Sequence, residues 1–310
     1  MKIYHGLDDF VRLNNAVVTS GTFDGVHIGH QKILARLIEI SKRCEGESVV
    51  LTFWPHPRLV LHPEEDNVKL LNTFEEKAEL LKDAGIGHLV RIPFTKEFSN
   101  YSSEDFIRKI LVDTIGTRKL VIGYDHRFGH NREGSFGQLK ENGPKYGFEV
   151  EEIPRQDIDH IGVSSTRIRN ALVAGDIETS THFLGRPYSI TGRVVPGDKL
   201  GRLLGFPTAN IEIDTKFKLI PQDGIYAVTV SHEQRQYKAM MYIGNRPTIN
   251  GSRRNLEVNL FDFNQEIYGD SLTVYFHKMI RPDSRFHDLE DLKKQLVVDK
   301  IEALKILERE

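Results

Sequence analysis

Short β-branched runs alternate with helical patterns over the first 185 residues, and this alternation restricts the possible fold more than any other feature of the sequence. Repeated strand–helix–strand units of this kind form a parallel sheet with helices on its faces. Several of the runs are almost continuously apolar, as expected for strands covered on both faces. The predicted strands are Ala16–Ser20, Ser48–Phe53, Gly87–Ile92, Lys119–Gly123 and Phe148–Ile153, and one helix is predicted to start at Ser102 or Ser103.

The pattern changes after residue 185, where short strands separated by Gly, Pro and Asn follow one another. It is typical of an antiparallel barrel or sandwich, and we expect a β-barrel with a terminal helix over residues 289–307 and no helix before it. Two domains are therefore predicted, residues 1–185 and residues 186–310. The predicted strands are Tyr188–Val195, Thr208–Ile213, Tyr226–Ser231, Lys238–Ile243, Leu256–Phe261 and Ser271–Ile280, and the apolar stripe of the helix is Leu289, Leu292, Leu296, Ile301, Leu304 and Ile306.

The composition is that of an ordinary globular protein with no global attraction to nucleic acid or membranes. Forty-two Lys and Arg against 44 Asp and Glu leave a net charge of -2, so any phosphate binding has to be local. A single cysteine, Cys44, excludes an intramolecular disulfide and a zinc finger. Residues 1–10 lack the pattern expected of a signal peptide, and no apolar run reaches the roughly 20 residues that span a bilayer. We expect a cytoplasmic protein; its oligomeric state is not predicted.

The segment Ser20–His30 runs from the first predicted strand directly into a helix. Glycines allow a tight turn, and the free N–H groups of the new helix favour phosphate. His27 and His30, three residues apart, can both donate to one oxyanion. Two alternatives stay open: a metal site, for which the HExxH glutamate and a nearby third ligand are missing, and a purely structural turn.

A second polar segment, Val163–Arg169, lies at the start of another helix near the end of the same half. Its hydroxyls, the helix N–H groups and Arg167 together form a compact clamp for a triphosphate. The simpler interpretation is a serine N-cap, Ser164 or Ser165, followed by solvated arginines. Each segment alone is weak evidence, whereas the two together are specific.

Residues 15–185 resemble the Rossmann-like HxGH nucleotidyltransferases, and Gly21–His27 with Ser164–Arg169 resembles their FMN adenylyltransferase branch. Residues 52–57 and 123–129 also match, although His126 stands where phenylalanine is commoner. The resemblance implies that His27 and His30 contact the ATP phosphates and that Asp125 lies near the flavin. It further assigns nucleotide binding to Gly21, Phe23, Gly25, Ser164, Ser165, Thr166 and Arg167.

In the second half, Gly192–Arg202 is a glycine-spaced basic loop that suits phosphate but equally fits an exposed hairpin turn. It leads into Pro207–Asn210. Thr208 and Asn210 are two residues apart, so a strand would direct both side chains to one face, where their oxygens suit hydrated Mg²⁺.

Residues 186–310 resemble riboflavin kinases, with the motif Pro207–Asn210 intact. The resemblance assigns ATP binding to Gly192, Gly197 and Gly201 and flavin binding to Arg202. Glu257 is predicted to be the base, because a riboflavin hydroxyl is a poor nucleophile until a carboxylate accepts its proton; the alternative is an exposed charge on an alternating strand. Asn259 stands where histidine is common.

Together the resemblances imply a bifunctional transferase that makes FMN from riboflavin and ATP and then FAD from FMN and ATP, with Mg²⁺ as cofactor. The expected ligands are thus riboflavin, FMN, FAD and ATP. The adenylylation step needs no base, because an FMN phosphate, with a second pKa of about 6, is mostly dianionic at neutral pH. Two other classes are the alternatives: a class I aminoacyl-tRNA synthetase, which shares the letters HIGH, and a non-catalytic flavin-binding regulator.

Overall fold

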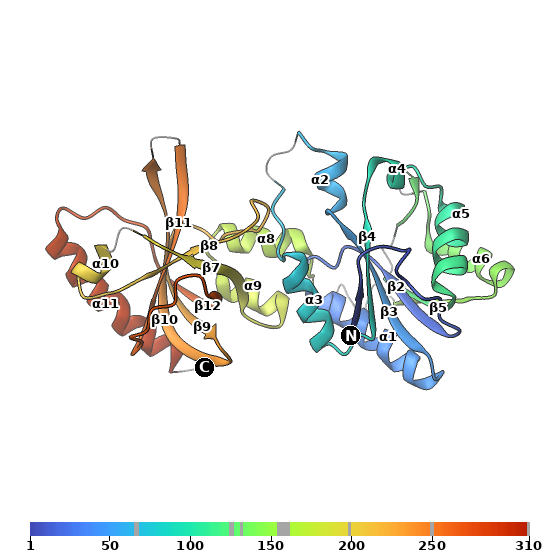
Figure 1. The fold of residues 1–310 in the computed structure, drawn as a ribbon, viewed down its shortest axis with the longest axis horizontal. Helices are drawn as coiled ribbons and strands as arrows, with labels where there is room; N and C mark the ends of the chain where they lie inside the picture. The colour runs from blue at the N-terminus through green and yellow to red at the C-terminus, as the bar shows by residue number, and fades with distance from the viewer. Residues whose placement is uncertain are drawn as a thin grey trace. The chain divides into compact units, whose positions relative to one another are not determined.

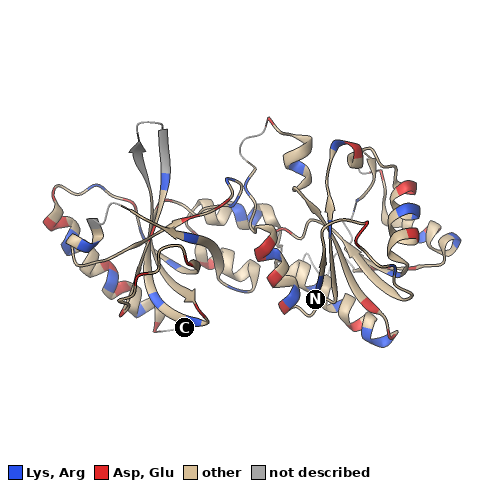
Figure 2. Ribbon diagram, in the orientation of Figure 1, with Lys and Arg blue, Asp and Glu red and all other residues tan. Residues whose placement is uncertain are grey.

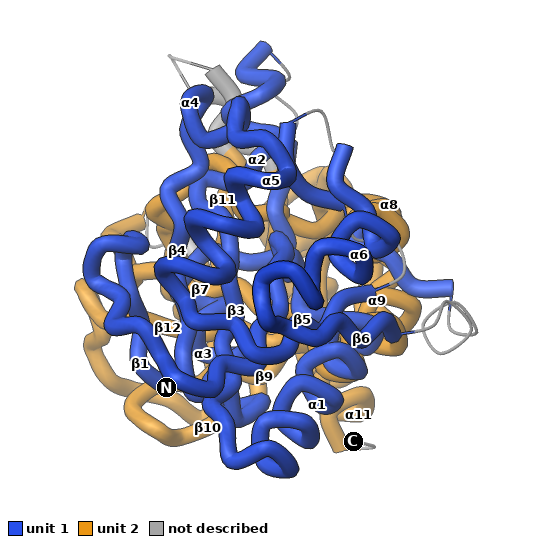
Figure 3. The backbone as a smooth tube through the Cα atoms, turned by 90° about the vertical axis from the view of Figure 1, so that its right-hand side faces the viewer, with its two compact units in different colours: residues 1–165 blue, residues 166–310 orange. Residues whose placement is uncertain are grey.

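A computed structural model of the chain describes residues 1–64, 68–123, 127–130, 133–153, 162–197, 200–248 and 251–308. The chain forms two compact units, Met1–Ser165 and Thr166–Glu310 (Figure 3). In both units Lys and Arg are interspersed with Asp and Glu along the helices and strands (Figure 2). No helix of the described residues is long and apolar enough to cross a bilayer.

The first unit is built on a six-stranded sheet in which every neighbouring pair is parallel, as predicted. All five predicted strands are present (Figure 1). The short edge strand β1 was not predicted, since its three residues, two exposed and one half-buried, carry no clear alternation. The strands are β1 (Lys2–Tyr4), β2 (Ala16–Ser20), β3 (Glu47–Trp54), β4 (His88–Pro93), β5 (Thr117–Gly123) and β6 (Glu149–Ile153), in the order β1-β4-β3-β2-β5-β6.

Successive side chains of a strand point to opposite faces of the sheet, so an apolar layer forms on each face. Val17 packs with residues of α1 (Ile28–Arg43) and α3 (Phe74–Asp83). Val18 packs with residues of η1 (Phe106–Ile115) and α6 (Phe136–Tyr146). The remaining helices are α2 (Pro57–Leu61), α4 (Lys96–Ser99) and α5 (Ser103–Asp105). The helix predicted to start at Ser102 or Ser103 begins at Ser103, with Ser102 as its N-cap.

The strand order places a topological switch point between β2 and β5. From β2 the chain moves outward through β3 to β4, then returns to lay β5 against the other side of β2. In open α/β sheets, ligands bind outside the carboxyl ends of the strands at such a point. The turn after Ser20 therefore lies where the fold favours a ligand.

The second unit is a closed antiparallel barrel with the order β10-β11-β8-β7-β12-β9, so the barrel prediction is confirmed. Its strands are β7 (Tyr188–Val195), β8 (Ala209–Glu212), β9 (Gly224–His232), β10 (Arg235–Thr248), β11 (Gly251–Leu260) and β12 (Ser271–Pro282). The helices are α8 (Ser165–Val173), α9 (Ile177–Leu184), α10 (Leu200–Leu203) and α11 (Leu289–Leu307).

Two helices of this unit, α10 and α11, differ from what the sequence predicted. A short helix, α10, precedes the terminal one, because residues 200–203 close a single helical turn after β7. In α11 the buried face runs through Leu296, Asp299, Ala303 and Leu307. Two residues of the predicted stripe are therefore exposed, Leu289 at 55% and Ile301 at 49%. The helix α9 contacts β7 and β12, which is why the compact unit starts before the predicted domain boundary at residue 185.

A buried ion pair fastens α11 to the barrel. Arg281 of β12 donates to both carboxylate oxygens of Asp299, at 3.0 Å from Nε to Oδ1 and 2.8 Å from Nη2 to Oδ2. The Asp299 side chain is 1% exposed, and Gln295 Nε2 donates to Oδ1 at 2.9 Å. Asp299 is thereby compensated where an isolated charge would be very costly.

Asp299→Ala is expected to lower the free energy of unfolding by about 3–5 kcal/mol, because it leaves the Arg281 guanidinium without its buried partner. The control is Glu302→Ala on the same helix, whose contact with Lys305 is exposed at 3.7 Å and contributes less than about 1 kcal/mol. Urea unfolding followed by circular dichroism measures both. Equal effects of the two substitutions would contradict the anchoring role.

Candidate active sites

The turn between β2 and α1 is tight and conformationally strained. Gly25 has φ 88°, and the non-glycine residues Phe23 and Val26 have φ 47° and 40°. Positive φ is costly for a β-branched residue such as Val26 and persists only where surrounding contacts enforce it. A hydrogen bond from Val26 N to Phe23 O, at 3.2 Å, closes the turn.

His27 and His30 lie together at the start of α1. His27 is the N-cap of this helix, and its Nδ1 accepts a hydrogen bond from His30 N at 3.3 Å. The two rings stack with their centroids 3.6 Å apart. His27 is buried, His30 is half-buried, and the edge-on ring of Phe23 lies 5.2 Å from that of His30.

The turn is joined to the second polar segment of the same half. Ser165 Oγ donates to the carbonyl oxygen of Asp24 at 2.9 Å, linking positions 141 residues apart. The sequence predicted that these two segments act together, and Ser165 contacts the turn directly. The helix α8 begins at Ser165, which places Ser164 at the N-cap position.

The other predicted residues of this clamp belong to the second compact unit. Thr166 and Arg167 are exposed, and the Arg167 guanidinium carbon lies 6.0 Å from the centroid of the Phe183 ring. Asp125, the predicted flavin contact, lies outside the described residues. Gly21 hydrogen-bonds through its N–H to Leu51 O at 3.0 Å, at the start of the turn.

Sequence reasoning missed Lys77, a buried lysine on α3 that reaches the turn. Its Nζ donates to Thr22 O at 2.7 Å and to Thr52 Oγ1 at 3.3 Å. Burial lowers the pKa of Lys77 to about 8, against the opposing attraction of Asp24. Its position in the sequence could have revealed it, because Lys77 falls on the apolar helical stripe of Phe74, Ala78 and Leu81, where a lysine is unexpected.

In the second unit, Thr208, Asn210 and Glu257 come together at the β8–β11 pair. Thr208 Oγ1 donates to Glu257 Oε2 at 3.0 Å, and Asn210 is the register partner of Glu257. Asn255 Nδ2 donates to the other carboxylate oxygen at 2.7 Å. Glu257 is therefore half-buried and hydrogen-bonded rather than fully exposed. Asn259 Nδ2 holds the carbonyl of Pro207 at 2.6 Å.

The glycine-spaced segment lies against these residues. A Cβ on Gly197 would come within 2.0 Å of the Asn210 amide nitrogen, and one on Gly201 within 2.4 Å of Phe206 O. Both glycines thus let the segment approach Pro207–Asn210. Gly192 lies earlier, inside β7, where a Cβ would meet Glu212 O at 2.6 Å, and Arg202 is exposed on α10.

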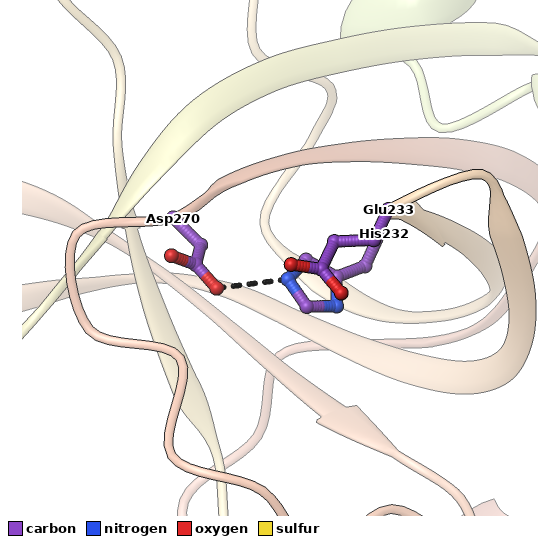
Figure 4. A group of neighbouring side chains, drawn as sticks. All are labelled: His232, Glu233 and Asp270. Atoms are coloured by element: carbon purple, nitrogen blue, oxygen red, sulfur yellow. Dashed lines mark hydrogen bonds and ion pairs between the residues drawn. The ribbon is translucent and has the colours of Figure 1, made fainter.

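Among the described residues, one group of His, Asp and Glu side chains is close enough to share a metal ion: His232, Glu233 and Asp270 (Figure 4). His232 Nε2 lies 2.8 Å from Asp270 Oδ2. On β10, Arg235 is the register partner of His232, and Tyr242 is the register partner of Glu257. These two positions are seven residues apart, which along a strand separates His232 from Glu257 by roughly 23 Å. This group is therefore separate from the predicted magnesium ligands, and it does not include His27 or His30.

Two different protein families match the N-terminal and C-terminal halves of the chain. Residues 10–167 match the family model described as FAD synthetase, and residues 184–307 match that described as riboflavin kinase. Bifunctional riboflavin kinase/FMN adenylyltransferases are similar over nearly the whole chain. That of Buchnera aphidicola subsp. Schizaphis graminum is 37% identical, covering 98% of both chains, and that of Pseudomonas fluorescens is 39% identical, covering 91% of this chain and 90% of its own.

A solved structure has the same fold. A crystal structure described as a macrolide-efflux protein from Streptococcus pneumoniae superposes with a TM-score of 0.87 at 30% identity, covering 96% of this chain and 97% of its own. The agreement extends over both units.

Gly201→Ala is expected to destabilise the second unit by about 1–3 kcal/mol, because the new Cβ would overlap the Phe206 carbonyl and force residues 206–208 to shift. The control is Gly137→Ala in α6, where a Cβ meets only Ser135 Oγ, at 3.7 Å. That change is expected to stabilise by up to about 1 kcal/mol. Urea unfolding of both variants measures the difference; a Gly201→Ala protein as stable as wild type would show that the contact is not close.

Proposed function

The chain belongs to the bifunctional riboflavin kinase/FMN adenylyltransferase family, and from this membership and the geometry above we propose how its residues carry out the two reactions. It phosphorylates riboflavin with ATP to give FMN, and it adenylylates FMN with a second ATP to give FAD and pyrophosphate. We propose further that the two catalytic domains meet near residue 185 and that both reactions use Mg²⁺.

For adenylylation, the turn Gly21–His30 and the segment Ser164–Arg167 hold the ATP phosphates while the FMN phosphate attacks the α-phosphorus. The attacking phosphate is already an anion, so the protein has to position the reactants and stabilise charge. Since His27 Nδ1 accepts a hydrogen bond, a neutral ring carries its proton on Nε2, which is then a donor for a phosphate oxygen. His27 thus acts as a donor rather than a base, and the same role is proposed for His30.

The observation that supports this assignment most strongly is the hydrogen bond from Ser165 to Asp24. It holds Ser165, of the second predicted phosphate-binding segment, at the turn that leads into α1. The N-terminus of a helix contributes partial positive charge to a bound anion.

For phosphorylation, Glu257 accepts the proton of the riboflavin 5′-hydroxyl as that oxygen attacks the γ-phosphorus of ATP. The hydrogen bonds from Thr208 and Asn255 fix the orientation of the carboxylate. Gly197 and Gly201 approach Asn210 and Phe206 closely, and they are the proposed contacts for the ATP phosphates. Arg202, exposed on α10, is the proposed flavin contact.

Thr208, Asn210 and the neighbouring carboxylate of Glu257 offer the hard oxygen donors that Mg²⁺ prefers, so the residues present fit this ion. Thr208 and Asn210 are the proposed ligands. When bound there, Mg²⁺ would neutralise charge on the ATP phosphates.

A cytoplasmic location is proposed as well. The substrate ATP and the exposed thiol of Cys44 both suit a reducing, nucleotide-rich compartment. Riboflavin, FMN, FAD and ATP are the ligands that the two activities require.

Glu257→Gln is expected to lower the rate of FMN formation about 100-fold or more while FAD formation from added FMN continues, because only the hydroxyl nucleophile needs a base. Products are separated chromatographically after incubation with Mg-ATP and either flavin. The control, Glu266→Gln, changes an exposed glutamate of the same unit and should leave both activities intact. A Glu257→Gln enzyme that makes FMN at the wild-type rate would refute the assignment.

His30→Ala is expected to stop the sequence at FMN, with FAD formation reduced about 100-fold or more and riboflavin phosphorylation unchanged, because one donor to the phosphates is lost. His62→Ala, at an exposed histidine of the same unit, is the matched control. If wild-type protein makes neither flavin product, or charges tRNA with an amino acid instead, the proposed function is wrong.

A further inference from the structure

The buried ammonium of Lys77 is not explained by the packing of its helix. Lys77 is 2% exposed and lies between Phe74, Ala78 and Leu81 on the face of α3 that otherwise contributes apolar side chains to the core. Burying a charge is costly unless it is paired and hydrogen-bonded, and an apolar residue of similar size would fill this position at lower cost. A lysine here requires a reason.

The ammonium group of Lys77 contacts the turn that follows β2. The Nζ atom donates to Thr22 O at 2.7 Å, and Thr52 Oγ1 donates to the same carbonyl at 3.3 Å. Thr52 is fully buried in β3. Lys77 therefore links α3, β3 and the residue that follows Gly21, and its Nζ also lies 5.5 Å from the centroid of the Trp54 ring.

The carboxylate of Asp24, in the turn, binds the backbone of the segment that precedes α3. Asp24 Oδ1 accepts hydrogen bonds from Leu71 N at 2.9 Å and Asn72 N at 3.3 Å. Asp24 is 3% exposed, and its charge opposes the effect of burial on the pKa of Lys77. The turn and α3 are therefore linked twice, by the ammonium of Lys77 bound to the turn and by the carboxylate of Asp24 bound to the residues before α3.

The turn needs such support, because Phe23 and Val26 are held at positive φ between Thr22 and His27. A strained segment relaxes when its restraints are removed, and a shift of about 1 Å in a phosphate-binding group can cost on the order of 100-fold in rate. The restraints converge on the two residues around Phe23: Lys77 and Thr52 hold the carbonyl of Thr22, and Ser165 holds that of Asp24.

We propose that Lys77 is a positioning residue for adenylyl transfer, whose buried ammonium holds the Thr22 carbonyl and thereby keeps the Gly21–His30 turn in the conformation that binds the ATP phosphates. This inference rests on the function proposed for that turn. Lys77 acts through the backbone of the turn and, as a positive charge beneath it, also favours the polyanion.

Lys77→Met removes the charge and retains the length of the side chain. FAD formation from added FMN is expected to fall about 10- to 100-fold in kcat with a smaller change in the KM for FMN. Riboflavin phosphorylation by the same chain is the internal control and should not change. Fluorescence of Trp54, the only tryptophan, follows urea unfolding of the first unit and shows that the variant is folded under the assay conditions.

The pH dependence gives a readout that a merely structural lysine would not produce. Lys77 has a pKa of about 8, so its ammonium is present below this pH and is lost as the pH rises through it. The ratio of wild-type to Lys77→Met activity should therefore be largest below pH 8 and shrink above it. Asp24, His27 and His30, the other titratable groups of the turn, are present in both proteins, so the ratio isolates Lys77.

Lys77→Arg provides the rescue. Its guanidinium stays charged throughout this range, so the variant should be more active than Lys77→Met and should lack the alkaline loss that Lys77 causes. If Lys77→Met fails to fold, the pH profile of the Arg variant decides. Wild-type kcat in Lys77→Met, or a constant ratio across pH 8, would overturn the proposal, whereas absence of FAD formation by wild-type protein would instead refute the proposed function.

Discussion

Both halves of this chain have to hold polyphosphates with local groups, because 42 basic and 44 acidic residues leave no overall positive field. The two units meet this constraint differently. In the first, a parallel strand ends at the switch point of the sheet and leads through a tight turn into a helix N-terminus. In the second, a glycine-spaced segment packs against a pair of barrel strands. In each, the backbone approaches closely at glycines, and a few polar side chains complete the site.

The tight turn in the first unit depends on the structure around it. Its positive φ angles at Phe23 and Val26 are unfavourable by themselves, and the surrounding elements provide hydrogen bonds to its carbonyls and to the Asp24 carboxylate. These partners come from β3, from α3 and the segment before it, and from the beginning of α8. The charge of Lys77 is buried where it can act on the turn, which relates an otherwise costly core lysine to the chemistry of the site.

The two acceptors explain why only one unit presents a carboxylate in its proposed centre. The FMN phosphate is ionised before it reacts, so the proposed adenylylation site needs groups that stabilise charge and no base. The riboflavin hydroxyl must lose a proton, and Glu257 is held by Thr208 and Asn255 in an orientation suited to accept it. The difference in nucleophile therefore corresponds to a difference in the side chains that each fold presents.

The sequence by itself determined the parallel sheet, the barrel and the family, because strand periodicity and motifs such as Gly21–His27 and Pro207–Asn210 are local. It also indicated that the Ser164–Arg169 segment acts with the first turn. Only the tertiary structure showed β1, α10 and the exposure of Ile301, which depend on pairing and helix orientation. Lys77 belongs to this second group: it lies 55 positions from Thr22 in the chain, and folding alone decides whether a lysine on an apolar stripe reaches solvent or a buried carbonyl.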